Sequence, residues 1–119
     1  MALFKKRHKA PQLRSAEDFE AVLSQGKPVL IDFYRYGCGP CQTMDGIVDE
    51  ISEEFEERAI VTKANVESVP GLFQKFNVRS TPTFLLITPA RDGLHMRWRH
   101  SGLVKKNVLT DNLERAIAP

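Results

Sequence analysis

The 119-residue sequence predicts a single domain of the α/β class. Segments with the 3.6-residue apolar period of helices alternate with short apolar, β-branched runs that are typical of buried strands. The length suits one domain, and a content of 42% hydrophobic and 27% charged residues excludes wholesale disorder. The longest apolar runs reach about five residues, far fewer than the roughly 20 of a membrane-spanning helix.

The first half of the chain is expected to form two helices separated by a strand. Ser15 provides an N-cap for a helix whose apolar residues repeat at three and four positions and which ends at Gly26. The β-branched run 29–33 follows as a strand that is buried on both faces. A long helix with an apolar stripe then extends from the two cysteines to Phe55.

The second half of the chain supplies three further strands and two helices. Strands are expected over residues 59–62, 83–88 and 94–100, and the last two are joined as a hairpin. A short helix is expected over residues 69–76, and an apolar stripe over residues 104–117 indicates a closing helix. The resulting order of elements is αβαβαββα.

The net charge of +2 conceals three blocks of alternating sign. Residues 1–14 carry +5, residues 15–57 carry −9 and residues 58–119 carry +6. Most acids of the middle block fall on the long helix after the cysteines. We interpret residues 1–14 as a basic N-terminal extension with a frayed end, the alternative being a nucleic-acid or membrane-surface tag. No apolar segment follows these bases, so we expect no secretory signal and a cytoplasmic location.

The only two cysteines, Cys38 and Cys41, enclose Gly39 and Pro40 between a buried strand and a long helix. This count excludes a scaffold of several disulfides and any four-cysteine zinc or iron–sulfur site. Gly39 permits a tight turn and Pro40 suits the first helical turn, which places Cys38 at a helix N-terminus. Free amides and the helix dipole stabilise a thiolate there, and Cys41 is placed to resolve a mixed disulfide. The spacing therefore predicts a redox-active dithiol.

Two other interpretations of the cysteine pair stay open. One is a pair of buried, inert cysteines that happen to lie close together. The other is a zinc site, which needs further ligands, yet His8, His95 and His100 are the only histidines and no second cysteine pair exists. We expect no metal and no bound cofactor beyond the dithiol itself.

Asp32 interrupts the apolar run 29–33. A carboxylate inside a buried strand is costly unless it has a task or a partner. Desolvation raises the pKa of such a group and suits it to accept a proton near neutral pH. The alternative is a strand end that faces solvent.

Several of these residues resemble the motifs of the thioredoxin family. They are Asp32-Phe33, Cys38-Gly39-Pro40-Cys41, Thr81-Pro82-Thr83 and Gly102, and the resemblance covers residues 15–117. It implies a thioredoxin fold over residues 15–119, a single three-layer domain with a central mixed sheet of four to five strands flanked by helices. It also implies that Cys38 is the nucleophile and Cys41 the resolving cysteine.

The same resemblance assigns roles to the groups around the dithiol. Asp32 matches the aspartate that accepts the proton of the resolving cysteine, and Lys63 matches the lysine that accompanies it. Pro82 matches a cis proline beside the disulfide, which turns the Thr81 backbone toward an incoming chain. The alternative for Lys63 is an ordinary surface lysine, and the alternative for Gly102 is a plain loop glycine. The expected substrate groove comprises Gly37, Gly39, Pro40, Thr81, Pro82 and Gly102.

The chain departs from the family pattern at Gly37, where the family usually carries tryptophan. Tyr34 and Tyr36 offer substitute aromatic rings close by. The only tryptophan, Trp98, lies between two arginines, a pattern that suits nucleic-acid binding. Alternation along a strand explains it more simply by placing Arg97 and Arg99 on one face and Trp98 on the other. We expect no nucleic-acid partner.

The predicted function is a dithiol–disulfide oxidoreductase that reduces protein disulfides and receives electrons from an NADPH-linked, thioredoxin reductase-like enzyme. Electron transport and cell redox homeostasis are the corresponding roles. The alternatives are a redox carrier of narrow specificity for one dedicated partner and a binding module that uses the fold as a scaffold. The expected partners are the reductase and disulfide-containing proteins. We expect no association with a membrane, and the expected state is a monomer.

Overall fold

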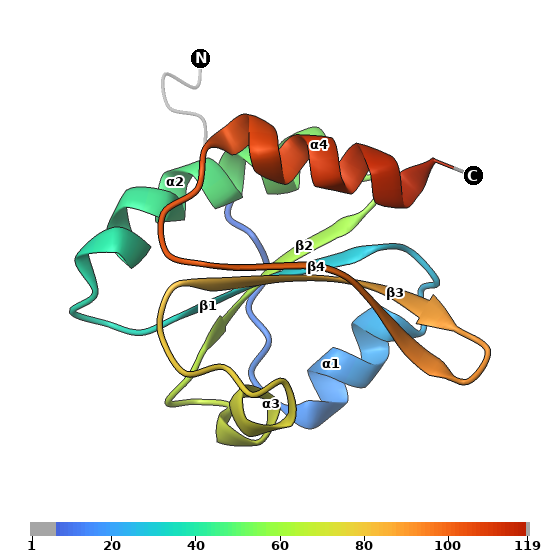
Figure 1. The fold of residues 1–119 in the computed structure, drawn as a ribbon, viewed down its shortest axis with the longest axis horizontal. Helices are drawn as coiled ribbons and strands as arrows, with labels where there is room; N and C mark the ends of the chain where they lie inside the picture. The colour runs from blue at the N-terminus through green and yellow to red at the C-terminus, as the bar shows by residue number, and fades with distance from the viewer. Residues whose placement is uncertain (1–6, 119) are drawn as a thin grey trace, which may run out of the picture.

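Helices and strands alternate along the chain, as the sequence predicts (Figure 1). The computed structural model describes residues 7–118. The elements are α1 (Ala16–Leu23), β1 (Val29–Tyr34), α2 (Gly39–Glu54), β2 (Ile60–Asn65), α3 (Pro70–Lys75), β3 (Thr83–Ala90), β4 (Gly93–Ser101) and α4 (Lys106–Ile117). The longest helix has 16 residues, and within residues 7–118 none is long and apolar enough to cross a membrane.

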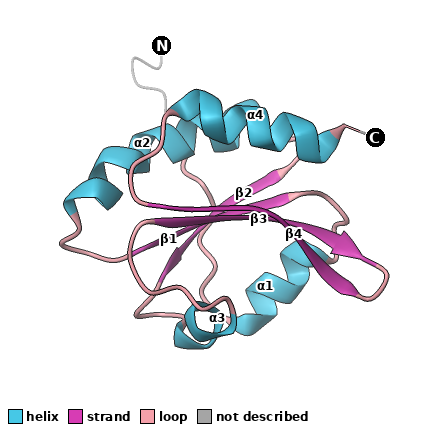
Figure 2. Ribbon diagram, viewed as in Figure 1, coloured by secondary structure: helices cyan, strands magenta, loops and turns pink. Residues whose placement is uncertain are grey.

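The four strands form one mixed sheet in the order β2-β1-β3-β4. β1 is parallel to β2 and antiparallel to β3, and β3 is antiparallel to β4. Helices α2 and α4 lie over one face of the sheet, and α1 and α3 lie over the other (Figure 2). The expected three-layer domain with a central mixed sheet is confirmed.

The alternating side chains of the strands divide the core into two layers. Leu30, Phe84 and Leu86 pack beneath α2 and α4, while Ile31 and Leu85 pack against α1 and α3. All five side chains are almost completely buried. Strand β1 is therefore covered on both faces, so any polar group it carries loses contact with water.

The packed part of the chain begins nearer to the N-terminus than the sequence predicts. The N–H of Leu13 donates to the Lys63 carbonyl at 2.8 Å, and the N–H of Lys63 donates to the Pro11 carbonyl at 3.0 Å. Ala10 and Leu13 are buried. The frayed extension expected through residue 14 is thus wrong for this segment, because Pro11 and Leu13 pair with Lys63 at the outer edge of β2. Residues 1–6 of that extension lie outside the described residues.

The basic–aromatic stretch of β4 follows strand alternation only in part. Trp98 packs against the core layer beneath α4, as the alternation predicts. A β-bulge shifts the register between Leu86 and Ile87, so Arg97 and Arg99 do not act alike. Arg99 donates to the Asn77 carbonyl after α3, whereas Arg97 reaches a carbonyl of α4. The arginines are therefore held by the protein's own carbonyls.

The packing of the N-terminal segment can be tested at Leu13, which is only 2% exposed. We expect Leu13→Ala to lower the free energy of unfolding by roughly 2–4 kcal/mol, because it leaves a cavity in the core. The matched control is Leu103→Ala, at an exposed leucine, which should change it by less than about 0.5 kcal/mol. Urea unfolding measures both, and equal effects of the two substitutions would contradict the packing.

Candidate active site

The two cysteines form a disulfide at the N-terminus of α2. Their Cα atoms lie 5.2 Å apart, and both side chains are buried. Cys38 has the extended backbone of an N-cap residue, and Pro40 occupies the first turn of the helix. Gly39 and Pro40 are exposed at this helix start. The dithiol thus occupies the position that the sequence predicts, between β1 and the long helix.

Hydrogen-bond donors converge on the sulfur of Cys38. The backbone N–H of Cys41 donates to Cys38 Sγ at 3.2 Å, and the Thr81 hydroxyl lies 3.6 Å from the same atom. The positive end of the α2 dipole points to the same place. Once the disulfide is reduced, these groups stabilise negative charge on Cys38, which is the requirement for an attacking thiolate.

The loop before β3 brings Thr81 and Pro82 beside the disulfide. The peptide bond between them is cis, as expected. The carbonyl oxygen of Thr81 lies 3.6 Å from Cys38 Sγ. Gly102 joins this group because its N–H donates to the Pro82 carbonyl at 2.8 Å. Segments from three parts of the chain therefore meet at one end of the sheet.

A shallow depression of about 240 Å³ lies on the other side of the disulfide. Its lining includes Tyr34, Tyr36, Gly37, Cys41 and Asp45. Gly37 has φ of +75°, a left-handed conformation that favours glycine over any larger residue. The two tyrosine rings meet edge to face with centroids 6.0 Å apart, and Tyr36 is 77% exposed. Aromatic surface is thus present beside Gly37 although the residue itself has none.

Asp32 is buried inside the domain. It is 1% exposed and lies on the same face of β1 as Leu30, beneath α2. The alternative of a strand end facing solvent is therefore wrong. Its Oδ1 atom has no hydrogen-bond partner within the described part of the chain. Burial raises the pKa of Asp32 from 3.8 to about 7, and this outweighs the opposite effect of the Lys63 charge.

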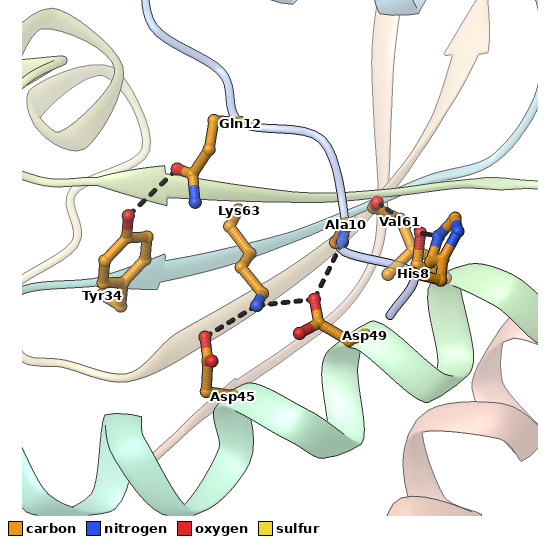
Figure 3. A network of polar contacts seen from close by, with 9 residues as sticks. His8, Ala10, Gln12, Tyr34, Asp45, Asp49, Val61 and Lys63 are labelled. Atoms are coloured by element: carbon orange, nitrogen blue, oxygen red, sulfur yellow. Dashed lines mark hydrogen bonds and ion pairs between the residues drawn. The ribbon is translucent and has the colours of Figure 1, made fainter. Parts of the chain in front are cut away.

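Lys63 lies directly opposite Asp32 in the register of β1 and β2. It is buried, so it is no ordinary surface lysine. Its ammonium nitrogen is 2.7 Å from Asp45 Oδ1 and 2.7 Å from Asp49 Oδ1 (Figure 3). The partnership with Asp32 that the resemblance implies is thus not a direct ion pair among the described residues. Burial lowers the pKa of Lys63, but the hydrogen bonds that its ammonium group donates to the two carboxylates raise it above its ordinary value.

Asp45 and Asp49 are members of the site that the sequence reasoning missed. Their spacing of four residues places both on one side of α2, next to the buried Met44 and Val48. The signal available in the sequence is that both acids border the apolar stripe of the helix. Their contact with Lys63 depends on how the helix packs on the sheet. Within residues 7–118, no cluster of three or more histidine, cysteine or acidic side chains is arranged to hold a metal ion.

Comparisons with known proteins agree with this geometry. The family model described as Thioredoxin matches residues 10–115. A thioredoxin from Synechocystis is 36% identical over 105 residues, which cover 88% of this chain and 94% of that protein. The solved structure of a mutant thioredoxin from Halobacterium salinarum superimposes with a TM-score of 0.82 at 27% identity, over 98% of this chain and 97% of that one.

Chloroplastic proteins are also among the relatives. The M-type thioredoxin of spinach is 34% identical over 100 residues, which cover 84% of this chain. The matched region spans 53% of the spinach protein and 64% of a similar chloroplastic thioredoxin from Arabidopsis thaliana. The family match covers nearly all of the described residues and includes the disulfide, the cis proline and the buried aspartate. The chain therefore belongs to the thioredoxin family.

Proposed function

We propose that this protein is a dithiol–disulfide oxidoreductase that reduces disulfides in other proteins. The observation that carries the proposal is the Cys38–Cys41 disulfide at the N-terminus of α2, with the Thr81 hydroxyl and the Cys41 amide directed at Cys38 Sγ. Membership of the thioredoxin family supports the same activity. Reduction of one substrate disulfide requires two electrons, and the two thiols supply them.

In the first step, the Cys38 thiolate attacks one sulfur of the substrate disulfide. A bond forms between Cys38 Sγ and that sulfur while the substrate bond breaks, and the second substrate sulfur leaves as a thiolate that takes a proton from water. The Cys41 N–H and the Thr81 hydroxyl stabilise the thiolate before the attack. Cys38 is therefore the nucleophile.

In the second step, Cys41 resolves the mixed disulfide. Its thiol gives its proton to Asp32, and the resulting thiolate attacks Cys38 Sγ. The Cys38–Cys41 bond forms, and the remaining substrate sulfur leaves as a thiolate. Asp32 suits the role of proton acceptor because it lies beneath α2 with a pKa of about 7, so it is available in both protonation states near neutral pH.

Substrate binding is proposed to use the backbone beside the disulfide. Thr81 lies between the cis proline and Cys38 Sγ, where an extended substrate segment can pair with main-chain groups. Gly37, Gly39, Pro40 and Gly102 complete this groove in the proposal. Their small or rigid side chains permit close approach of a second chain.

The electron supply and the cellular setting follow from the proposed chemistry. An NADPH-linked, thioredoxin reductase-like enzyme would return the disulfide to the dithiol, and no cofactor besides the dithiol is required. Disulfide-containing proteins would be the substrates of a monomeric carrier. A reducing compartment such as the cytoplasm suits this direction of electron flow. The chloroplast, where some of the relatives are found, is a second such compartment.

The roles of the two cysteines can be separated by substitution with serine. We expect Cys38→Ser to abolish the reduction of insulin disulfides by dithiothreitol above the uncatalysed rate, because no thiolate remains to attack. Cys41→Ser should also lose turnover but accumulate a mixed disulfide with substrate, which mass spectrometry detects. Each variant is the control for the other, since both remove the internal disulfide. Turnover at the wild-type rate in Cys38→Ser would overturn the proposed function.

The buried carboxyl group of Asp32 makes stability depend on pH. Because its pKa is about 7 in the folded protein and near 3.8 when exposed, the folded state binds a proton that the unfolded chain has lost between these values. Stability therefore falls as the pH rises through this window. We expect oxidised Asp32→Asn to be more stable than wild type by roughly 4 kcal/mol at pH 8, since a tenfold change in proton affinity corresponds to about 1.4 kcal/mol.

The same comparison at pH 4 is the control for this prediction. There both side chains are uncharged in the folded state, so the advantage of Asp32→Asn should largely disappear. Unfolding by guanidinium chloride at the two pH values measures the difference. An advantage that does not change with pH would show that the burial of the ionised carboxylate is not its cause.

A further inference from the structure

One cation lies among three carboxylates beneath α2. Asp32 and Lys63 are opposite one another on neighbouring strands, and both lie in the layer that α2 covers. The Lys63 ammonium nevertheless bonds to Asp45 and Asp49 of the helix, at 2.7 Å each (Figure 3). Asp32 Oδ1 has no partner among residues 7–118. The side chain of Lys63 is thus directed to the helix and not to its neighbour on the sheet.

The two helix acids that hold Lys63 differ in their surroundings. Asp49 also accepts the backbone N–H of Ala10 at 2.8 Å, and its side chain is 17% exposed. The N-terminal segment therefore fixes Asp49. The side chain of Asp45 is 61% exposed and lies in the wall of the depression that contains Cys41. Asp45 is thus the carboxylate of the pair that lines the same depression as Cys41.

We propose that Asp45 is a positioning residue, which holds the Lys63 ammonium toward α2 and so prevents it from neutralising Asp32. This inference rests on the proposed function, because the consequence is that Asp32 keeps a protonated form near neutral pH. Without Asp45, the ammonium group keeps only its contact with Asp49 among the described residues, so it can shift toward Asp32. A closer positive charge favours the ionised carboxylate. Loss of the Asp45 charge acts in the same direction. Both effects shift the titration of Asp32 to lower pH.

Few other charges act on Asp32. Lys63 comes from β2, and Asp45 and Asp49 come from α2. Its partner on β3 is Phe84, which is uncharged. The thiols of the two cysteines at the start of α2 join these groups once the disulfide is reduced. In the oxidised protein, the titration of Asp32 therefore responds to the position of the Lys63 charge and to the charges of Asp45 and Asp49.

The test compares Asp45→Asn with Glu50→Gln in the oxidised protein. Each substitution removes one negative charge from an exposed position on α2, but Glu50 pairs with Lys106 of α4 instead of Lys63. Carbon-13 NMR follows the Asp32 carboxyl group through pH 4–9. We expect the midpoint of the titration to fall by about half a pH unit or more in Asp45→Asn. In Glu50→Gln the midpoint should move by less than about 0.2 on the pH scale, because Glu50 pairs with Lys106 and not with Lys63, and is not among the charges that act on Asp32.

A second pair of variants separates repositioning of Lys63 from the loss of a charge. In a Lys63→Met background no ammonium group remains to move, so adding Asp45→Asn should shift the midpoint by less than half as much. An unchanged midpoint in Asp45→Asn would overturn the proposal, as would a shift of equal size in both backgrounds. If Lys63→Met does not fold, Lys63→Gln, which also lacks the ammonium group, takes its place as the background.

The role of Asp45 and the oxidoreductase activity can fail separately. The NMR titration uses oxidised protein and requires no substrate, so it tests the position of Lys63 independently of the oxidoreductase activity. In an active protein, the rate of mixed-disulfide resolution should show its pH midpoint lowered by the same amount in Asp45→Asn. A protein that does not reduce insulin yet shows the NMR shift would retain the role of Asp45 and lose the oxidoreductase function.

Discussion

The packing of α2 against the sheet determines the positions of all the reactive groups. Its buried residues Met44, Val48 and Ile51 sit over β1 and β2. That contact places the helix N-terminus, with its free amides, at the end of β1 where the cysteines lie. The same contact removes water from Asp32. A shift of the helix along the sheet would therefore change both the surroundings of the cysteine pair and the burial of Asp32.

The uneven charge along the sequence becomes balanced in three dimensions. The acids of α2 face bases from later segments: Lys63 of β2 binds two of them, and Lys106 of α4 binds two more. The contacts of Lys106 are exposed, and such pairs contribute little to stability. Lys63 is buried, where the removal of a partner leaves an uncompensated charge. The energetic weight of the acidic helix is thus concentrated near the active site.

Local patterns in the sequence predict most of the fold and the dithiol. Apolar periodicity and the Cys38–Cys41 spacing depend on neighbouring residues, so they can be read without tertiary contacts. The partners of Lys63 depend on which side of α2 faces β2 and on side-chain direction, which no local pattern contains. Residues 10–13 have no periodicity of their own and are ordered by the edge of β2. The bulge at Arg97 likewise results from pairing between strands.

The segment that covers β2 also affects how copies of the protein meet. An exposed outer strand offers free N–H and carbonyl groups, to which a second chain can add and so begin aggregation. Residues 11–13 pair with the N–H and carbonyl of Lys63 in the middle of β2, and the bulge in β4 interrupts the opposite edge. Pairing at Lys63 and the bulge thus restrict strand addition at the two edges of the sheet. Edge-to-edge association of copies is the event that this arrangement makes less favourable.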